Sequence, residues 1–125
     1  MSAEVRAEVP ASGEHVQILR NVVAAVAARA GCTVDTLADL RLAVDEAATR
    51  LLHDVGGASE LVLEASRGAG RIELLVAATG PTDGWPPEGL ARSMGWQILS
   101  ALVDDAQART SPDGPAIAFT VPARG

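Results

Sequence analysis

Apolar and polar residues alternate with a period of two at the start of the chain and then change to a helical period. Residues 3–9 place Ala or Val at every second position between Glu and Arg, which predicts a half-buried strand that Pro10 ends. A helix is predicted to open at Ser12 or Gly13 and to stop at Gly31, since glycine is the usual residue just past a helix end. The apolar stripe of this helix includes Val16, Leu19, Val22, Val23 and Val26.

A second helical pattern begins near Thr33 or Asp35 and runs to about Asp54, ahead of a Gly-Gly pair. Its buried stripe is predicted to consist of Leu37, Leu40, Val44, Ala47, Ala48, Leu51 and Val55. The opposite side of the helical wheel holds Asp39, Leu42, Glu46, Arg50 and His53. Composition alone predicts that this side faces solvent and carries an i,i+4 ion pair between Glu46 and Arg50, worth about 0.3–0.5 kcal/mol. Leu42 on the same side weakens that interpretation.

The rest of the chain is mostly strand-like. Four strands are predicted, at 60–66, 71–78, 104–110 and 116–121. A helix is predicted at 92–103, after a loop rich in Pro and Gly at 79–89. Short turns at 67–70 and 111–115 join the strands into two β-hairpins. The resulting order, β-α-α-β-β-α-β-β, predicts an α+β two-layer sandwich with the helices on one face of the sheet. A length of 125 residues predicts one domain, 1–125.

Composition narrows the classes of partner. The net charge is −6, and all ten basic residues are Arg. An acidic chain without a basic stripe, with only three aromatic residues, argues against nucleic acid and anionic membranes as direct partners. One cysteine and two histidines offer no zinc spacing, so no metal ligands are predicted. No apolar run is long enough to span a membrane and no signal-peptide pattern is present, so we expect a cytoplasmic protein.

Residues 39–50, Asp-Leu-Arg-Leu-Ala-Val-Asp-Glu-Ala-Ala-Thr-Arg, resemble the second helix of bacterial anti-sigma factors. These form the serine-kinase branch of the histidine kinase-like ATPases. The resemblance continues in order along the chain, with Gly80 similar to a glycine of the first glycine box and residues 92–96 similar to the second. It is closest to actinobacterial antagonists of sigma-B/sigma-F-type factors, and it implies the Bergerat (histidine kinase-like ATPase) fold.

The departures from the family pattern concern its nucleotide site. In active kinases of the family a Glu at the position of Glu46 acts as base or orients the attacking hydroxyl, and an Asn one turn later holds Mg²⁺. Here Arg50 occupies the Asn position, and a guanidinium has no lone pair for a metal. The adenine-reading Asp falls near Ala78, and the segment between Gly80 and Gly95 is shorter than the family's ATP lid.

The predicted site is therefore a vestigial one, made of Glu46 as former base and of Glu46, Arg50, Gly80 and Gly95 as remnants of ATP binding. We expect no bound cofactor and no Mg²⁺, with weak, metal-free ATP binding through Arg50 as the alternative.

The predicted function is that of an anti-sigma factor. Such a protein would sequester an alternative sigma factor, be released by an anti-anti-sigma protein, and pair as a homodimer through a sheet edge. Arg20 matches an Arg that family members use in partner contacts, although an ordinary exposed Arg is an equal interpretation. Two other hypotheses stay open: an active ATP-Mg-dependent serine kinase that phosphorylates its antagonist, and a regulator whose partner is not a sigma factor.

Other residues have mainly structural interpretations. Gly95 could serve close helix packing, Trp96 is expected in the core, and Cys32 is expected to pack rather than to act in redox chemistry. Asp104, Asp105 and Asp113 are interpreted as strand-end and turn residues.

Overall fold

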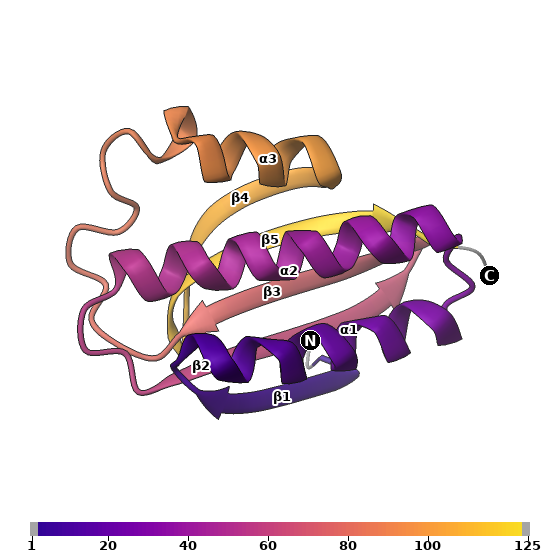
Figure 1. Cartoon of the computed structure of the whole chain (residues 1–125), viewed down its shortest axis with the longest axis horizontal. Helices are drawn as coiled ribbons and strands as arrows, with labels where there is room; N and C mark the ends of the chain where they lie inside the picture. The colour runs from indigo at the N-terminus through magenta and orange to yellow at the C-terminus, as the bar shows by residue number, and fades with distance from the viewer. Residues whose placement is uncertain (1–2, 124–125) are drawn as a thin grey trace.

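The described part of the chain, residues 3–123, forms a five-stranded antiparallel sheet with three α-helices on one of its faces (Figure 1). In this computed structural model the elements are β1 (Val5–Pro10), α1 (Val16–Arg29), α2 (Val34–Asp54), β2 (Glu60–Gly68), β3 (Arg71–Ala78), α3 (Met94–Leu102), β4 (Asp104–Ser111) and β5 (Gly114–Pro122). The predicted element order and the α+β two-layer architecture are confirmed. No helix among these residues is long and apolar enough to cross a membrane.

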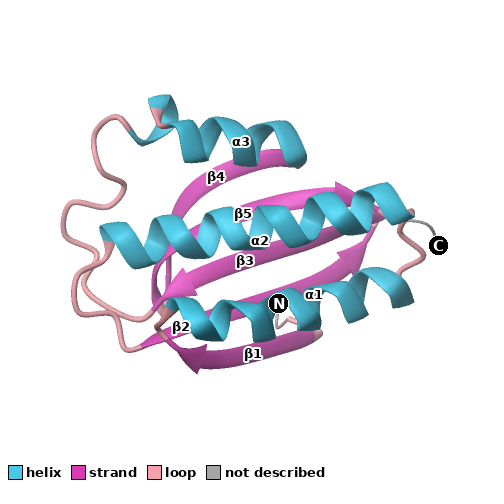
Figure 2. Cartoon of the chain, in the orientation of Figure 1, coloured by secondary structure: helices cyan, strands magenta, loops and turns pink. Residues whose placement is uncertain are grey.

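The strand order in the sheet is β1-β2-β3-β5-β4, with every neighbouring pair antiparallel. Both predicted hairpins are present, β2–β3 and β4–β5, and β1 joins the sheet beside β2 with Val5 opposite Ala65 (Figure 2). Thus β1 and β4 are the edge strands. A bulge between Asp104 and Gln107 interrupts the β4 edge, and Asp105 has a φ of 52° there.

The core lies between the sheet and the helices. On α2, which runs between α1 and α3 in Figure 1, the predicted stripe is buried except for the half-buried Leu37. The sheet side of this core includes Leu61, Leu63, Ile72, Val76, Ile117 and Phe119, all almost inaccessible to solvent. Because these positions alternate along the strands, the period-two pattern of the sequence directs them toward the helices.

Short 3₁₀ turns precede two helices that were predicted to begin earlier. Gly13–His15 forms such a turn before α1. The Ser12 hydroxyl bonds to the His15 ring at 2.6 Å and makes no capping hydrogen bond to the backbone. Leu90–Arg92 forms the other, and α3 begins only after Ser93, whose hydroxyl accepts a hydrogen bond from the Trp96 backbone N–H at 3.2 Å. That bond satisfies one of the free donors at the helix start and sets its first residue.

The β4–β5 turn is shorter than predicted, because pairing continues to Ser111 and resumes at Gly114. Only glycine fits at position 114, where φ is 147° and an added Cβ would collide with the carbonyl oxygen of Ala78. Asp113 is more than the ordinary turn residue predicted, since it accepts two hydrogen bonds from Arg6 of β1. This ion pair joins β1 to the turn between β4 and β5, although β2 and β3 separate β1 from β5 in the sheet order.

Candidate functional site

The contact between α2 and α3 brings together three of the residues singled out in the sequence. Gly95, in the first turn of α3, lies directly against Glu46 and Arg50 of α2. A Cβ placed on Gly95 would be 3.3 Å from Oε2 of Glu46 and 3.6 Å from Nη2 of Arg50. The absence of a side chain at Gly95 therefore allows the start of α3 to approach this carboxylate and this guanidinium. The close-packing interpretation of Gly95 agrees with this geometry.

The predicted Glu46–Arg50 ion pair is wrong. Arg50 instead directs Nη1 to Oδ1 of Asp54, one turn further along α2, at 3.6 Å. Oδ1 of Asp54 also bonds to Nδ1 of His53 at 2.9 Å. Sequence reasoning missed Asp54 because it was taken as the end of the helix, although its i,i+4 spacing to Arg50 was the available signal.

The side of α2 that carries Glu46 and Arg50 is not a plain solvent-facing surface. Leu42 and His53 are exposed as predicted, but Glu46 and Arg50 are half-buried because α3 lies alongside. The Arg50 side chain is 28% exposed and that of Asp54 11%. Nε of Arg50 and Oδ2 of Asp54 are inaccessible and have no hydrogen-bond partner among the described residues. The pair is thus an incompletely satisfied polar contact beneath the start of α3.

These side chains do not fit a divalent cation at the position of Arg50. Every guanidinium nitrogen offers protons and none offers a lone pair, and the positive charge repels a metal ion. Asp54, the carboxylate that forms an ion pair with Arg50, is thereby already engaged with a positive charge. The guanidinium itself can contact an anion directly.

Gly80 lies apart from this contact, just beyond β3 and against the segment that follows α2. A Cβ placed on Gly80 would be 3.1 Å from Cγ1 of Val55 and 3.7 Å from Cα of Ala58. Ala78, two residues earlier, is completely buried and its methyl group offers no hydrogen-bond acceptor. Gly80 therefore has a packing role in this structure.

The loop between β3 and α3 is attached to the sheet by Trp85. The indole Nε1 donates a hydrogen bond to the carbonyl oxygen of Arg109 on β4 at 2.9 Å, and the half-buried ring packs against the core. Figure 2 shows this loop as the long connection leading to α3. The hydrogen bond and the half-buried ring together hold the loop between β3 and α3 against the sheet.

Arg20, Trp96 and Cys32 lie outside the Glu46–Arg50–Gly95 contact. Arg20 is on α1, which flanks α2 on the side away from α3 (Figure 1), and its inaccessible Nε has no partner among the described residues. Trp96 packs on the core, as expected. Cys32 also packs there and donates from Sγ to the Pro122 carbonyl at 3.6 Å. Burial raises the pKa of the Cys32 thiol, which disfavours the reactive thiolate.

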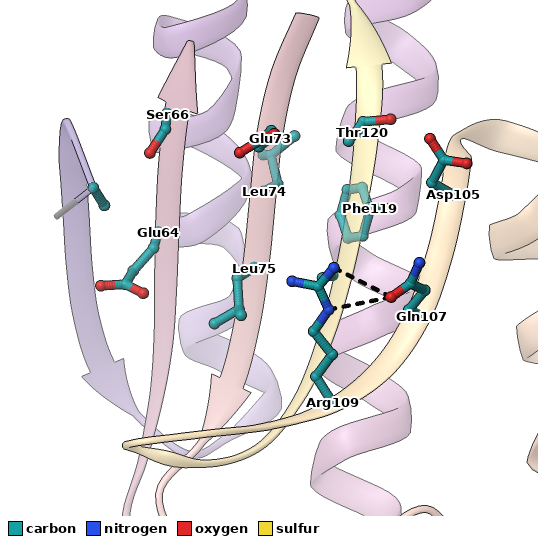
Figure 3. A pocket seen from close by; sticks show the side chains of 12 residues that line it. Glu64, Ser66, Glu73, Leu74, Leu75, Asp105, Gln107, Arg109, Phe119 and Thr120 are labelled. Atoms are coloured by element: carbon teal, nitrogen blue, oxygen red, sulfur yellow. Dashed lines mark hydrogen bonds between the residues drawn. The ribbon is translucent and has the colours of Figure 1, made fainter. Parts of the chain in front are cut away.

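A groove of about 380 Å³ lies on the other face of the sheet, which carries no helix (Figure 3). Arg109 and Gln107 of β4 lie in it side by side, with Nη2 of Arg109 donating to Oε1 of Gln107 at 3.2 Å. Glu64, Glu73 and Asp105 line its sides. The sequence analysis did not single out this groove, because it arises where alternate residues of four strands meet.

The antiparallel sheet with helices on one face, and with Glu46 and Arg50 of the second helix against a glycine at the start of the last one, defines an α+β two-layer sandwich. The chain belongs to the family described as "Histidine kinase-like ATPase domain", whose model matches residues 9–121. It is 32% identical over 117 residues to the anti-sigma-F factor RsbW of Mycobacterium tuberculosis, covering 94% of this chain and 68% of the relative. It is also 27% identical over 128 residues to the serine-protein kinase RsbW of Bacillus thuringiensis, covering 83% of this chain and 76% of the relative.

Proposed function

We propose that this protein is an anti-sigma factor that sequesters an alternative sigma factor, which is released when an anti-anti-sigma protein competes for the same face of the anti-sigma factor. The similarity to the mycobacterial anti-sigma-F factor, over most of both chains, supports this partner class. The net charge of −6 supports association with a basic surface of another protein through long-range steering.

The observation that carries the proposal is the position of Arg50. Its guanidinium lies against Gly95 and is paired with Asp54. In the active kinases that the chain resembles, the position of Arg50 is occupied by an Asn that holds Mg²⁺. Phosphoryl transfer depends almost entirely on positioned metal and charge. A guanidinium in place of a metal ligand therefore supports a protein that binds its partner without turning over Mg-ATP.

The experiment is a binding measurement with the purified chain and each alternative sigma factor of its source genome. We expect one of these factors to bind with the same affinity in the presence of Mg-ATP, ADP or EDTA. Calorimetry of the chain with Mg-ATP alone should show no metal-dependent binding. A complete failure to bind any of the sigma factors would overturn the proposal.

A serine kinase is the second candidate, because Glu46 keeps the position of the family's base and lies half-exposed beside Gly95. The similarity to a serine-protein kinase of Bacillus is consistent with it. Incubation of the chain with Mg-ATP and a cognate anti-anti-sigma protein separates the two candidates. Phosphate on a serine of that protein, lost in Glu46→Gln, would establish the kinase, whereas our proposal expects none.

We also propose that two copies pair through the outer edge of β1. This strand ends the sheet order, and its outer edge has no strand partner within residues 3–123. Exposed edges of this kind are commonly covered by a second chain. Light scattering during size-exclusion chromatography should give the mass of two chains, about twice the 12.8 kDa of one.

A further inference from the structure

α3 is a surface helix without a single charged residue. Its nine residues, Met94–Leu102, read Met-Gly-Trp-Gln-Ile-Leu-Ser-Ala-Leu, and only Leu99 is fully buried. A helix at the surface of a soluble protein normally presents charged or polar residues on its outer side. Here Met94 is 78% exposed and Ile98 is 41% exposed. An outer face of this composition is typical of a helix that another molecule covers.

The exposed apolar residues of α3 form one continuous strip. Met94, Ile98 and Ala101 have the i, i+4, i+7 spacing of one helix face, and with Arg92 and Gln97 they line a shallow groove of about 440 Å³. This spacing is the one by which helices pack into grooves of other helices. The unbranched Met94 side chain can also adapt to an irregular partner surface.

Leu42 of α2 is a further exposed apolar residue at the level of this strip. Gly95 of α3 lies against Glu46, whereas Leu102 lies beside Asp39 at the other end of the contact, so α2 and α3 run antiparallel. One turn back from Glu46 along α2 and one turn forward from Gly95 along α3 therefore lead to the same level, which is the level of Leu42 on α2 and of Ile98 on α3. Leu42 is 51% exposed. Four of the five large apolar residues exposed in the described chain thus lie on these two neighbouring helices.

The charge of the groove is opposite to that of the chain as a whole. Its one charged lining residue is Arg92, which is exposed and forms no ion pair with the described residues. The chain carries a net charge of −6. An apolar strip that ends in an unpaired guanidinium is complementary to an apolar segment that carries a carboxylate.

We infer that the groove lined by Arg92, Met94, Gln97, Ile98 and Ala101 docks an amphipathic helix of the sigma factor, with a carboxylate of that helix paired to Arg92. This inference rests on the proposed function and adds the surface on which the partner binds. Apolar residues of the docked helix cover Met94 and Ile98 and exclude water from them, which stabilises the complex by burial of apolar area. The ion pair with Arg92 sets the direction in which the helix lies.

The test compares variants of this surface with a matched variant elsewhere, using the sigma factor that binds the wild-type chain. Ile98→Asp should weaken binding by about tenfold or more, because it places a charge in a desolvated contact. Arg92→Glu should weaken it by a similar factor, whereas Arg92→Lys should retain most of the affinity. Val34→Asp is the control, since Val34 is 84% exposed and lies twelve residues before Glu46 on α2, about 18 Å along the helix.

Val34→Asp makes the same change of charge and should alter the dissociation constant by less than about twofold. All variants should keep the melting temperature of the wild type, because the replaced side chains are exposed. Equal affinity of Ile98→Asp, Val34→Asp and wild type would overturn the inference while leaving the anti-sigma function intact. A wild-type chain that binds no sigma factor would overturn both.

A second measurement reports on the surface directly. The chain has two methionines, Met1 and Met94, so protein labelled with ¹³C in the methionine methyl groups gives a spectrum that Met94→Leu assigns. Addition of the sigma factor should shift or broaden the Met94 signal. A Met94 signal that changes with the concentration of the chain alone would show that a second copy covers the groove. A signal that responds only to the anti-anti-sigma protein would assign the groove to that partner, and either result would overturn the inference.

Discussion

Arg6 and Asp113, 107 residues apart in the chain, form a two-point ion pair on the face of the sheet that carries no helix. Nη2 of Arg6 donates to Oδ1 of Asp113 at 2.8 Å and Nη1 to Oδ2 at 3.1 Å. The same guanidinium also donates to Glu8 and Glu64, at 3.0 and 2.9 Å. One arginine of the edge strand β1 thereby holds the tip of the β4–β5 hairpin, which gives the sheet a tie between its first and last strands.

This pair makes part of the stability depend on pH. The hydrogen bonds from Arg6 hold the pKa of Asp113 below its ordinary value of 3.8. The stabilisation is therefore fully present above that value and is lost as the pH falls through the lowered pKa. Asp113→Asn should lower the melting temperature at neutral pH, and its difference from wild type should shrink below about pH 4. Thermal unfolding followed by circular dichroism over this pH range measures the effect.

Asp83→Asn is the control for the acid range, because Asp83 is an exposed carboxylate in the loop before α3. It should match the wild type at every pH. A deficit of Asp113→Asn that stays constant down to acid pH would show that the carboxylate acts by packing and not by its charge.

Arg50 should stabilise α2 and the start of α3 through its contact with Asp54. Arg50→Met keeps much of the side-chain volume but leaves Asp54, 11% exposed, without a positive partner. The free energy of unfolding should fall by about 1–2 kcal/mol. Urea denaturation of Arg50→Met, Asp54→Asn and the double variant gives the coupling between the two residues. Arg109→Met removes an exposed guanidinium that bonds only to Gln107 within the described residues and leaves the backbone carbonyl that Trp85 contacts, so it should change stability by less than about 0.5 kcal/mol. A coupling of zero would contradict the role assigned to the pair.

The size of residue 95 should set the spacing between α2 and α3. Alanine there gains helix propensity of about 1 kcal/mol, but its Cβ would press on the Glu46 carboxylate, so Gly95→Ala should be near neutral. Gly95→Leu cannot be accommodated by moving one flexible carboxylate and should cost about 1–3 kcal/mol. Ser100→Leu, on the exposed side of the same helix, is the matched control and should leave the unfolding midpoint in urea unchanged.

Gly114 should tolerate no side chain. Its φ of 147° is unfavourable for other residues, and an added Cβ would collide with the Ala78 carbonyl oxygen. Gly114→Ala should therefore lower the free energy of unfolding by about 3 kcal/mol or more. Gly68→Ala, at the end of β2 with open space around its Cα and no positive φ, should change it little. Similar unfolding midpoints for the two variants would contradict the predicted collision.

The contact of Glu46, Arg50 and Gly95 shows where sequence reasoning reached its limit. The helical wheel placed Glu46 and Arg50 on one side of α2, and the structure brings both of them against Gly95. The part of these residues in nucleotide binding, which the resemblance implies, stays a prediction. The wheel could not tell that α3 covers that side of α2, so it predicted a solvent-facing Glu46–Arg50 pair. The structure instead pairs Arg50 with Asp54, with the start of α3 lying against the guanidinium.

The periodicity of apolar residues by itself determined the order of the strands and helices, the two hairpins and the faces that enter the core, since these depend on neighbours within a few turns or one hairpin. Only the tertiary structure decided that Arg6 holds Asp113, that Gly114 fits against Ala78, and that Gly95 lies against Glu46. Those relations join residues far apart in the chain, and their geometry depends on how the sheet twists and how the helices settle on it, which no local pattern encodes.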